Sequence, residues 1–405
     1  MVKVADKLSR DNGACPAWTP AFCRLQAAYE HRLSEAKRAS QRGQRVVGYV
    51  GNTVPVELII AAGCFPLRVA PVSGVTTMVD RYIENFADTD VRLIVELFVA
   101  GELDFLSLLV IPRSTESFHK LYLSIREVKR VGVTKAGPEI FLYEILHTQQ
   151  RFSRDYGLAR TRELALRLSR VAVQPVVDRS LRDALAATNQ TRELLGRLQQ
   201  ERRSSMRPPS GFEAHVAASA AQFLEHQVYN PLLAEWLSES SWQAGKGPRL
   251  LVMGCPLEYA DLHRLIDLAG GLVVAEDGDW GARAAAPLIS HAGEALAAIF
   301  DHYYASVPCA RLFPQALADR WFMENLRVGN IDGVIFYLPP PEDTFGWDFP
   351  RQRAAVEAAG LRWLLIRRDV RSAEAQAAVG AKLRDFLASL DPGRRVATRD
   401  LTSAY

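Results

Sequence analysis

Short, continuous apolar runs recur along the chain and are separated by longer stretches with helical periodicity. The first run is RVVGYV at 45–50, and the last is LRWLLIRRD at 361–369. Continuous apolar runs of this length are typical of strands that are buried on both faces of a parallel sheet. The pattern predicts strands at 45–50, 105–112, 139–146, 249–254, 272–277, 332–339 and 361–369.

The segments between these runs indicate helices with recognisable ends. The stretch at 21–43 predicts one helix that Gly43 closes. The stretch at 180–203 predicts a long helix that begins with a capping box, Ser180 to Asp183, and carries leucines along one face. A break at 204–211 follows, and Ser210 with Glu213 forms a second capping box.

Strands that alternate with amphipathic helices predict an α/β protein with parallel sheets and right-handed crossovers. We expect two doubly wound, Rossmann- or flavodoxin-like domains joined by a helical connector. The expected division is an N-terminal helical segment at 1–44, a first α/β domain at 45–179, the connector at 180–245 and a second α/β domain at 246–405.

Composition excludes several classes of function. The 405 residues carry 49 Lys and Arg against 46 Asp and Glu, a near-neutral balance that gives no support to nucleic-acid binding. No apolar run approaches a membrane span and no secretory signal is evident, so we expect a cytoplasmic protein. The five cysteines are scattered and form no Cys-x-x-Cys pair, which leaves disulfide frameworks and zinc ribbons unsupported.

Three turns lie where ligands bind in parallel sheets, beyond the carboxyl ends of strands. They are Gly51-Asn52-Thr53-Val54, Arg113-Ser114-Thr115-Glu116 and Gly254-Cys255-Pro256, and each precedes a predicted helix. In the first turn we expect Thr53 to cap the helix and Pro55 to lie just inside it. Helix N-termini favour anions and carbonyl oxygens, but small polar residues at these positions also serve simply as caps.

Six blocks of sequence, in order, resemble the large subunits of the 2-hydroxyacyl-CoA dehydratase and benzoyl-CoA reductase family, whose members include the 2-hydroxyglutaryl-CoA dehydratase D-component. The resemblance covers about residues 40 to 370. The blocks are GYVGNTVPVELIIAAGCFPLRV, GELDFLSLLVIPRSTES, ATNQTRELLGRLQQERRSSMRPPSGFEA, RLLVMGCPLEYADLHRLIDLAGGLVVAED, DGVIFYLP and DFPRQRAAVEAAGLRWLLI.

The resemblance implies a pair of related subunits that clamp an iron–sulfur cluster and an acyl-CoA thioester, with an ATP-dependent activator that supplies electrons. The cysteine positions of the family fall at Gly51, at Asp88 (with Arg92 matching a family arginine) and at Thr115. An iron–sulfur cluster needs thiolate ligands, and none of these three residues supplies one. We therefore predict no cluster, no metal site and no other cofactor in this chain, and a possible cluster in a partner subunit.

The same resemblance nominates residues for a shared cleft. Glu116 and His119 lie one helical turn apart and suit acid–base catalysis, although Glu116 also suits the helix dipole and His119 a plain surface position. In the second domain, Asp277 and Arg283 follow a strand where family members carry a thiol-bearing turn. The predicted substrate-binding residues are Tyr49, Gly51, Asn52, Thr53, Arg92, Ser114, Thr115, Gly254, Cys255, Asp277 and Arg283.

Three functional hypotheses remain open on the sequence. The chain is a cluster-free subunit of such a complex that pairs as a heterodimer with a cysteine-bearing homologue and contributes part of an acyl-CoA site; or it is a repurposed enzyme that uses the emptied cleft for acid–base or transfer chemistry; or it is a binding or scaffold protein. Without a Gly-x-Gly-x-x-Gly turn or a Walker loop, nucleotide hydrolysis by the chain itself is not expected.

Overall fold

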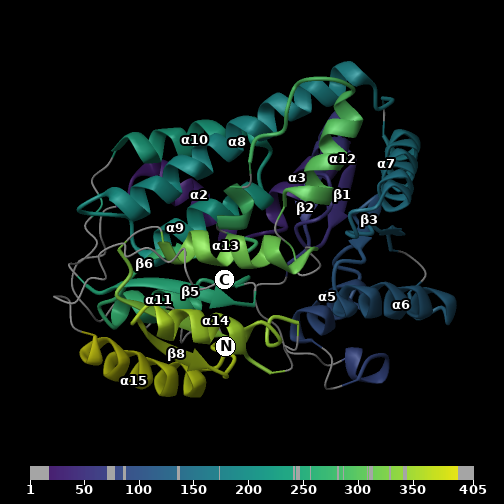
Figure 1. Ribbon diagram of the computed structural model, residues 1–405. Helices are drawn as coiled ribbons and strands as arrows, with labels where there is room; N and C mark the ends of the chain where they lie inside the picture. The colour runs from purple at the N-terminus through teal and green to yellow at the C-terminus, as the bar shows by residue number, and fades with distance from the viewer. Residues whose placement is uncertain are drawn as a thin grey trace.

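Two four-stranded sheets, both entirely parallel, form the framework of the computed structural model (Figure 1). It describes residues 18–70, 78–84, 88–134, 137–172, 174–239, 242, 247–255, 257–280, 282–285, 287–307, 309, 313–327, 330–340 and 344–390. The first sheet has the order β2-β1-β3-β4 and the second β6-β5-β7-β8. This confirms the predicted fold class of two doubly wound α/β domains.

Strand bounds follow the apolar runs closely. The first sheet contains β1 (Val46–Tyr49), β2 (Phe65–Arg68), β3 (Leu108–Pro112) and β4 (Glu139–Tyr143). The second contains β5 (Arg249–Gly254), β6 (Leu272–Glu276), β7 (Gly333–Tyr337) and β8 (Arg362–Ile366). The pattern missed β2, because a four-residue strand that includes Pro66 offers too short an apolar run to separate it from the preceding helix.

Helices cover both faces of the sheets. Up to the connector they are α2 (Pro20–Glu30), α3 (Ser34–Gln41), α4 (Val56–Ala61), η1 (Val79–Arg81), α5 (Thr89–Val99), α6 (Glu116–Arg130) and α7 (Arg151–Val171). The connector comprises α8 (Asp178–Ser204), α9 (Gly211–Ser219), η2 (Ala220–Gln222) and α10 (His226–Glu239). The remainder are α11 (Asp261–Leu268), η3 (Ala282–Ala285), α12 (Ala295–Ala305), α13 (Gln315–Arg327), α14 (Phe349–Ala358) and α15 (Ala373–Ser389).

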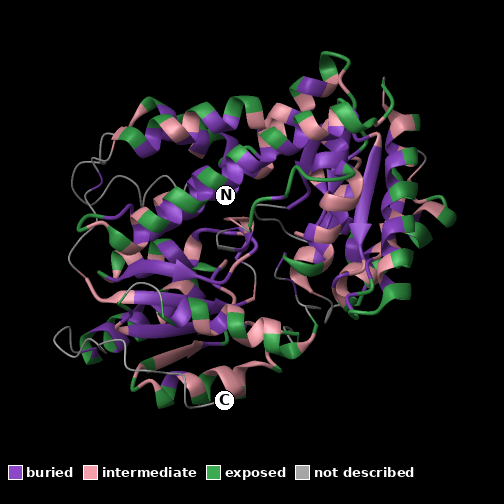
Figure 2. Ribbon diagram, turned by 45° about the horizontal axis from the view of Figure 1, so that its top comes forward, coloured by how far each residue is buried: buried purple, intermediate pink, exposed green. Residues whose placement is uncertain are grey.

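The strands are continuously apolar because both faces of each sheet are covered. In the first sheet Val46 and Leu109 belong to one hydrophobic cluster, whereas their neighbours Val47 and Leu108 belong to the cluster on the opposite face. The second sheet divides in the same way between two further clusters. Most strands are therefore buried along their length, while the outer faces of the helices are exposed (Figure 2).

Three local predictions were wrong. The single helix expected at 21–43 is split between α2 and α3, because the turn between them directs buried Arg32 inward to the carbonyl oxygens of Tyr29 and Ala70. The N-cap of α4 is Pro55, with no side-chain cap, and Thr53 is buried before it.

At the start of the connector, α8 begins two residues earlier than expected. Ser180 is therefore its third residue and not its cap, and its hydroxyl accepts a hydrogen bond from the Val177 N–H at 3.1 Å. The second predicted capping box, between Ser210 and Glu213 at the start of α9, is confirmed.

One segment from late in the chain packs with the first domain. Helix α12 lies against α7 and α8 (Figure 1), and its Ile299 and Phe300 are part of the same hydrophobic cluster as Val47 and Leu108. The chain thus crosses from the second sheet to the first and back after β6. Across the described ranges, every helix is too short or too polar to span a membrane.

Candidate functional site

A cleft lies between the two domains, at the carboxyl ends of strands from both sheets. It is lined from the first domain by Asn52 after β1 and by Ser114 and Thr115 after β3, and from the second by Cys255 after β5 and Pro339 after β7. Its volume is about 1130 Å³, including the space open to solvent at its mouth. In each sheet these strands are the central pair, where the strand order reverses, which is the usual ligand position in doubly wound folds.

The three positions nominated for cluster ligands converge on this region, but they offer no thiol. Asp88 is the N-cap of α5, where its carboxylate accepts from the Asp90 N–H at 3.1 Å. Thr115 is the N-cap of α6, where its hydroxyl accepts from the Phe118 N–H at 3.2 Å. Both side chains line the cleft and are used to begin helices.

Gly51 is incompatible with a cysteine for a geometric reason. Its φ of +68° lies in the left-handed region, and a Cβ there would meet Phe118 Cε2 at 2.8 Å. The thiols that line the cleft among the described residues are those of Cys255 and Cys309. Two thiols and a set of hard oxygens do not fit an iron–sulfur cluster, which requires a set of thiolates.

The predicted acid–base pair lies outside the cleft lining. Glu116 and His119 do share a face of α6, with Oε1 and Nδ1 3.7 Å apart, but the Glu116 side chain is 68% exposed. The residues between them, Ser117 and Phe118, face the cleft instead. A catalytic role for the pair remains a prediction that this geometry does not support.

Several other nominated residues are held in structural contacts. Tyr49 donates to Gln222 Oε1 at 2.6 Å in a second, smaller cavity that Gly51 also lines. Arg92 is buried and donates to the carbonyl oxygens of Ile83 and Glu84 and to Asp80, so it positions the segment 78–84.

Gly254, Asp277 and Arg283 line a third cavity beside the cleft. Gly254 has a φ of +118°, and a Cβ there would lie 2.2 Å from the Tyr337 carbonyl oxygen, so only glycine fits beside β7.

A buried ionic network joins the two domains at the base of the cleft. Arg283 donates to both carboxylate oxygens of Asp277, at 2.6 and 3.0 Å. Asp279 accepts from Asn52 Nδ2 at 3.0 Å and lies 3.5 Å from the Arg68 guanidinium. Burial opposes the charge of Arg283, but Asp277 raises the pKa of that guanidinium above its ordinary value. The predicted Asn52, Asp277 and Arg283 are therefore brought together.

A cluster of acids that the sequence did not reveal lies where the two domains meet in the cleft, with Asp90 from α5 of the first domain and Glu258 and Asp369 from the second. Arg371 donates to Asp90 Oδ1 at 2.9 Å and to Asp369 at 2.7 Å, and the Tyr259 hydroxyl lies 3.4 Å from Asp90. The Oε2 of Glu258 is buried without a hydrogen-bond partner among the described residues.

These acids titrate far from their ordinary range. Burial, and then the nearby carboxylate of Asp90, raise the pKa of Glu258 to about 8. Burial and the neighbouring Asp88 raise the pKa of Asp90 to about 6, against the opposing effect of Arg371. Glu258 is thus protonated at neutral pH, and a pKa close to the working pH suits a general acid or base. The sequence signal that could have revealed these residues is their position, because Glu258 follows the predicted strand at 249–254 and Arg371 follows the one at 361–369.

Comparisons with known proteins agree with this architecture. The family model described as 2-hydroxyglutaryl-CoA dehydratase, D-component, matches residues 52–390. The beta subunit of (R)-phenyllactyl-CoA dehydratase from Clostridium sporogenes is 20% identical over 349 residues, covering 82% of this chain and 89% of that protein. One of the benzoyl-CoA reductase subunits of Thauera aromatica is 22% identical over 338 residues, covering 78% and 84%. The putative dehydratase subunit YjiM of Escherichia coli K12 is 23% identical, covering 73% and 78%.

Proposed function

We propose that this chain, which belongs to the 2-hydroxyglutaryl-CoA dehydratase D-component family, is a cluster-free subunit of a larger complex. That complex is of the 2-hydroxyacyl-CoA dehydratase or benzoyl-CoA reductase type. The observation that carries this proposal is the state of the three cluster positions. Asp88 and Thr115 line the cleft but use their side chains as helix caps, and Gly51, next to the cleft residue Asn52, leaves little space for a side chain.

In this proposal the chain contributes one part of an acyl-CoA site. Helices α5 and α6 begin at the cleft, so the positive ends of their dipoles face a bound carbonyl or phosphate oxygen. Arg371, whose side chain is 22% exposed, lies in the same cleft in ion pairs with Asp90 and Asp369. The cleft is open to solvent at its mouth, so a CoA tail could extend out of it while the acyl group lies inside.

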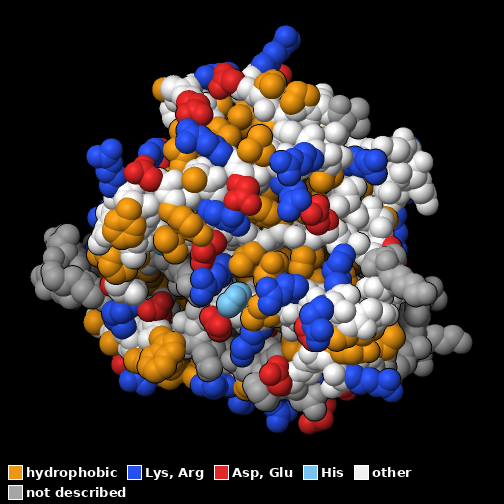
Figure 3. All heavy atoms as spheres, turned by 90° about the vertical axis from the view of Figure 1, so that its right-hand side faces the viewer, with side chains coloured by type: hydrophobic (Ala, Val, Ile, Leu, Met, Phe, Trp, Pro, Cys, Tyr) orange, Lys and Arg blue, Asp and Glu red, His pale blue; other side chains and the backbone are white. Residues whose placement is uncertain are grey.

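The electron-transferring cluster then belongs to a partner, a related chain that keeps the cysteines, and an ATP-dependent activator acts on that partner. Helix α7 offers a surface for such a chain, because Phe152, Tyr156 and Leu166 are exposed along one side of it. Figure 3 shows that, on the side of the molecule where α6 and α7 lie, hydrophobic patches alternate with charged side chains. Exposed hydrophobic patches with charged residues around them are a feature of protein–protein interaction sites.

Blocking the cleft tests the acyl-CoA site. Ser117 lines the cleft on the first turn of α6, so Ser117→Trp fills that space without a change of charge. We expect this variant to bind benzoyl-CoA or a 2-hydroxyacyl-CoA at least about tenfold more weakly than the unaltered chain in isothermal titration. Leu123→Trp, at an exposed position on the same helix, is the matched control and should bind normally. Equal binding by both variants would show that the acyl-CoA thioester binds outside this cleft.

A second candidate function rests on Glu258 and Asp90. Two acids in one cleft with pKa values of about 8 and about 6 are suited to proton transfer near neutral pH without any radical step. This candidate requires the chain alone to exchange the α-protons of an acyl-CoA in heavy water, and Glu258→Gln to abolish that exchange. If the acyl-CoA keeps its α-protons after incubation with the isolated chain, the subunit proposal is better supported.

A further inference from the structure

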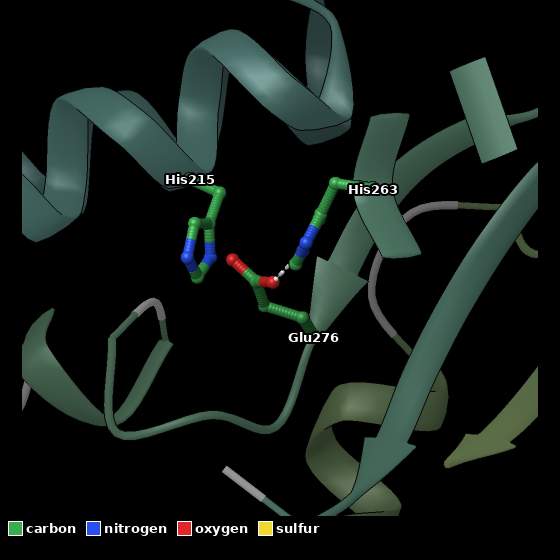
Figure 4. A group of neighbouring side chains, drawn as sticks. All are labelled: His215, His263 and Glu276. Carbon is green, nitrogen blue, oxygen red and sulfur yellow. Dashed lines mark hydrogen bonds and ion pairs between the residues drawn. The ribbon is translucent and has the colours of Figure 1, made fainter. Parts of the chain in front are cut away.

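A group of three metal-ligating side chains lies outside the cleft, where the connector meets the second domain. His215 comes from α9, His263 from α11 and Glu276 from the end of β6. One ligand atom from each lies within 4.8 Å of the others, and all three side chains point toward one another (Figure 4). Their exposed fractions are 1%, 0% and 3%, so the group is fully enclosed.

The two imidazoles have unused nitrogen atoms despite their burial. Neither Nδ1 nor Nε2 of His215 has a hydrogen-bond partner among the described residues, and Nδ1 of His263 has none either. The rings face each other with centroids 4.5 Å apart and an angle of 31° between their planes. Buried polar groups in native proteins almost always have a partner, so nitrogens grouped in this way are suited to bind a ligand.

Two neighbouring side chains orient the carboxylate of Glu276. Arg202 of α8 donates to Oε1 at 2.6 Å, and His263 Nε2 lies 2.6 Å from Oε2. A neutral imidazole has one nitrogen lone pair that can bind a metal ion, so each of the two histidines can supply one ligand atom beside this carboxylate.

We propose that His215, His263 and Glu276 bind one divalent transition-metal ion of the zinc type. Two imidazoles and one carboxylate form a known three-ligand set for zinc, which leaves a fourth position for water. Beside His215 and Glu276 lies a small cavity, also lined by Cys255 and Trp280, that provides room for this fourth ligand. Arg202 supplies the kind of outer hydrogen bond that orients a ligating carboxylate.

The ion would fasten the connector to the second domain. His215 lies on the helix that follows the break at 205–210, whereas His263 and Glu276 belong to the second α/β unit. Asp267, one turn after His263 on α11, already accepts from the Gly211 and Phe212 N–H groups at the start of α9, at 3.0 and 2.8 Å. The metal would add a second link between the same two helices, and this role is independent of any acyl-CoA chemistry.

Metal analysis of the full chain tests the proposal. We expect about one zinc ion per chain in protein grown with zinc, measured by elemental analysis after desalting, and rebinding of Zn²⁺ after removal with a chelator. His215→Leu should lose at least about tenfold in zinc affinity. Because His215 makes no hydrogen bond with the described residues, this change should leave the far-ultraviolet circular dichroism unaltered.

His302→Leu is the matched control, since His302 is also buried with an unpaired Nε2 among the described residues but lies outside the group; it should retain the zinc. If His215→Leu fails to fold, the visible spectrum of the unaltered chain with Co²⁺ decides, and a tetrahedral spectrum supports the site. Iron without acid-labile sulfide, lost in His215→Leu, would support the site with ferrous ion in place of zinc. A chain that binds neither Zn²⁺ nor Fe²⁺, or a His215→Leu variant that binds as well as the control, would overturn the proposal.

Discussion

Gly51, next to the cleft residue Asn52, is a position where the backbone and one neighbouring ring disfavour any side chain. Its left-handed backbone and the ring of Phe118 leave no room for a side chain, although the neighbouring Asn52 reaches across to Asp279. The sequence indicated that this turn lacks a ligand. Nothing in it indicated that Phe118, 67 positions later, fills the space, because contacts of that range depend on how β1 and β3 pair.

Replacement of Gly51 by alanine should therefore be costly. We expect Gly51→Ala to lower the free energy of unfolding by about 2–4 kcal/mol, because the left-handed conformation and the contact with Phe118 both oppose a Cβ. Gly43→Ala is the control, since Gly43 has a φ of +87° but open space around it; it should cost only about 1–2 kcal/mol. Urea unfolding of both variants measures the difference, and equal costs would show that Phe118 yields freely.

Glu258 should make stability depend on pH in a defined window. Its folded-state pKa of about 8 lies above the ordinary value of 4.5, so between these values the folded chain keeps a proton that the unfolded chain has lost. The contribution of Glu258 to the stability of the fold is therefore fully present below pH 4.5 and is lost as the pH rises toward 8.

Above pH 6 Asp90, whose pKa is about 6, is already largely ionised, so Glu258 should dominate the further loss of stability. Between pH 6 and 8.5 we expect the free energy of unfolding to fall by about 2–3 kcal/mol, at about 1.4 kcal/mol per unit of pKa. Glu258→Gln should flatten the decline in thermal-unfolding curves recorded over this range. Glu374→Gln, at a side chain that is 90% exposed, should leave it intact. A decline that persists in Glu258→Gln would assign it to another group.

At the scale of elements, helix α8 connects the two domains through one buried ion pair to each. Arg192 contacts Glu57 of α4 at 2.5 Å, and Arg202, ten residues later, contacts Glu276 of β6 at 2.6 Å. Amphipathic spacing predicted this helix and its leucine face correctly. The pairing of its arginines was beyond prediction, because each partner lies on a segment whose position depends on the assembled fold.

Removal of one partner of the buried Glu57–Arg192 ion pair should strongly destabilise the fold. Glu57 also accepts from the Tyr303 hydroxyl at 3.0 Å, so Glu57→Gln leaves the buried Arg192 without a counter-ion. We expect a loss of about 3–5 kcal/mol in the free energy of unfolding. Glu127→Gln breaks a solvent-exposed pair with Arg130 and should change the free energy of unfolding far less. Chemical denaturation with both variants provides the comparison, and similar losses would show that solvent reaches Glu57.

At the scale of the whole molecule, the two sheets repeat one topology and face each other across the cleft. The apolar runs predicted seven of the eight strands, and with them the parallel sheets and the strand ends that line the site. The acids of that site escaped prediction because Asp90 and Arg371 are 281 positions apart and meet only when the domains associate. The packing of α12 against the first domain was also unpredictable, because the hydrophobic periodicity of a helix does not show which sheet the helix covers.

The content of iron and acid-labile sulfide decides whether this member of the family carries a cluster of its own. The full chain would be purified alone under strict anaerobic conditions, and both elements measured per chain. We expect sulfide near zero, with any iron unaccompanied by sulfide, because Gly51, Asp88 and Thr115 supply no thiolate. Iron and sulfide in the equal amounts of a cluster would contradict it, and Cys255 and Cys309, which line the cleft, would then be the ligands to replace.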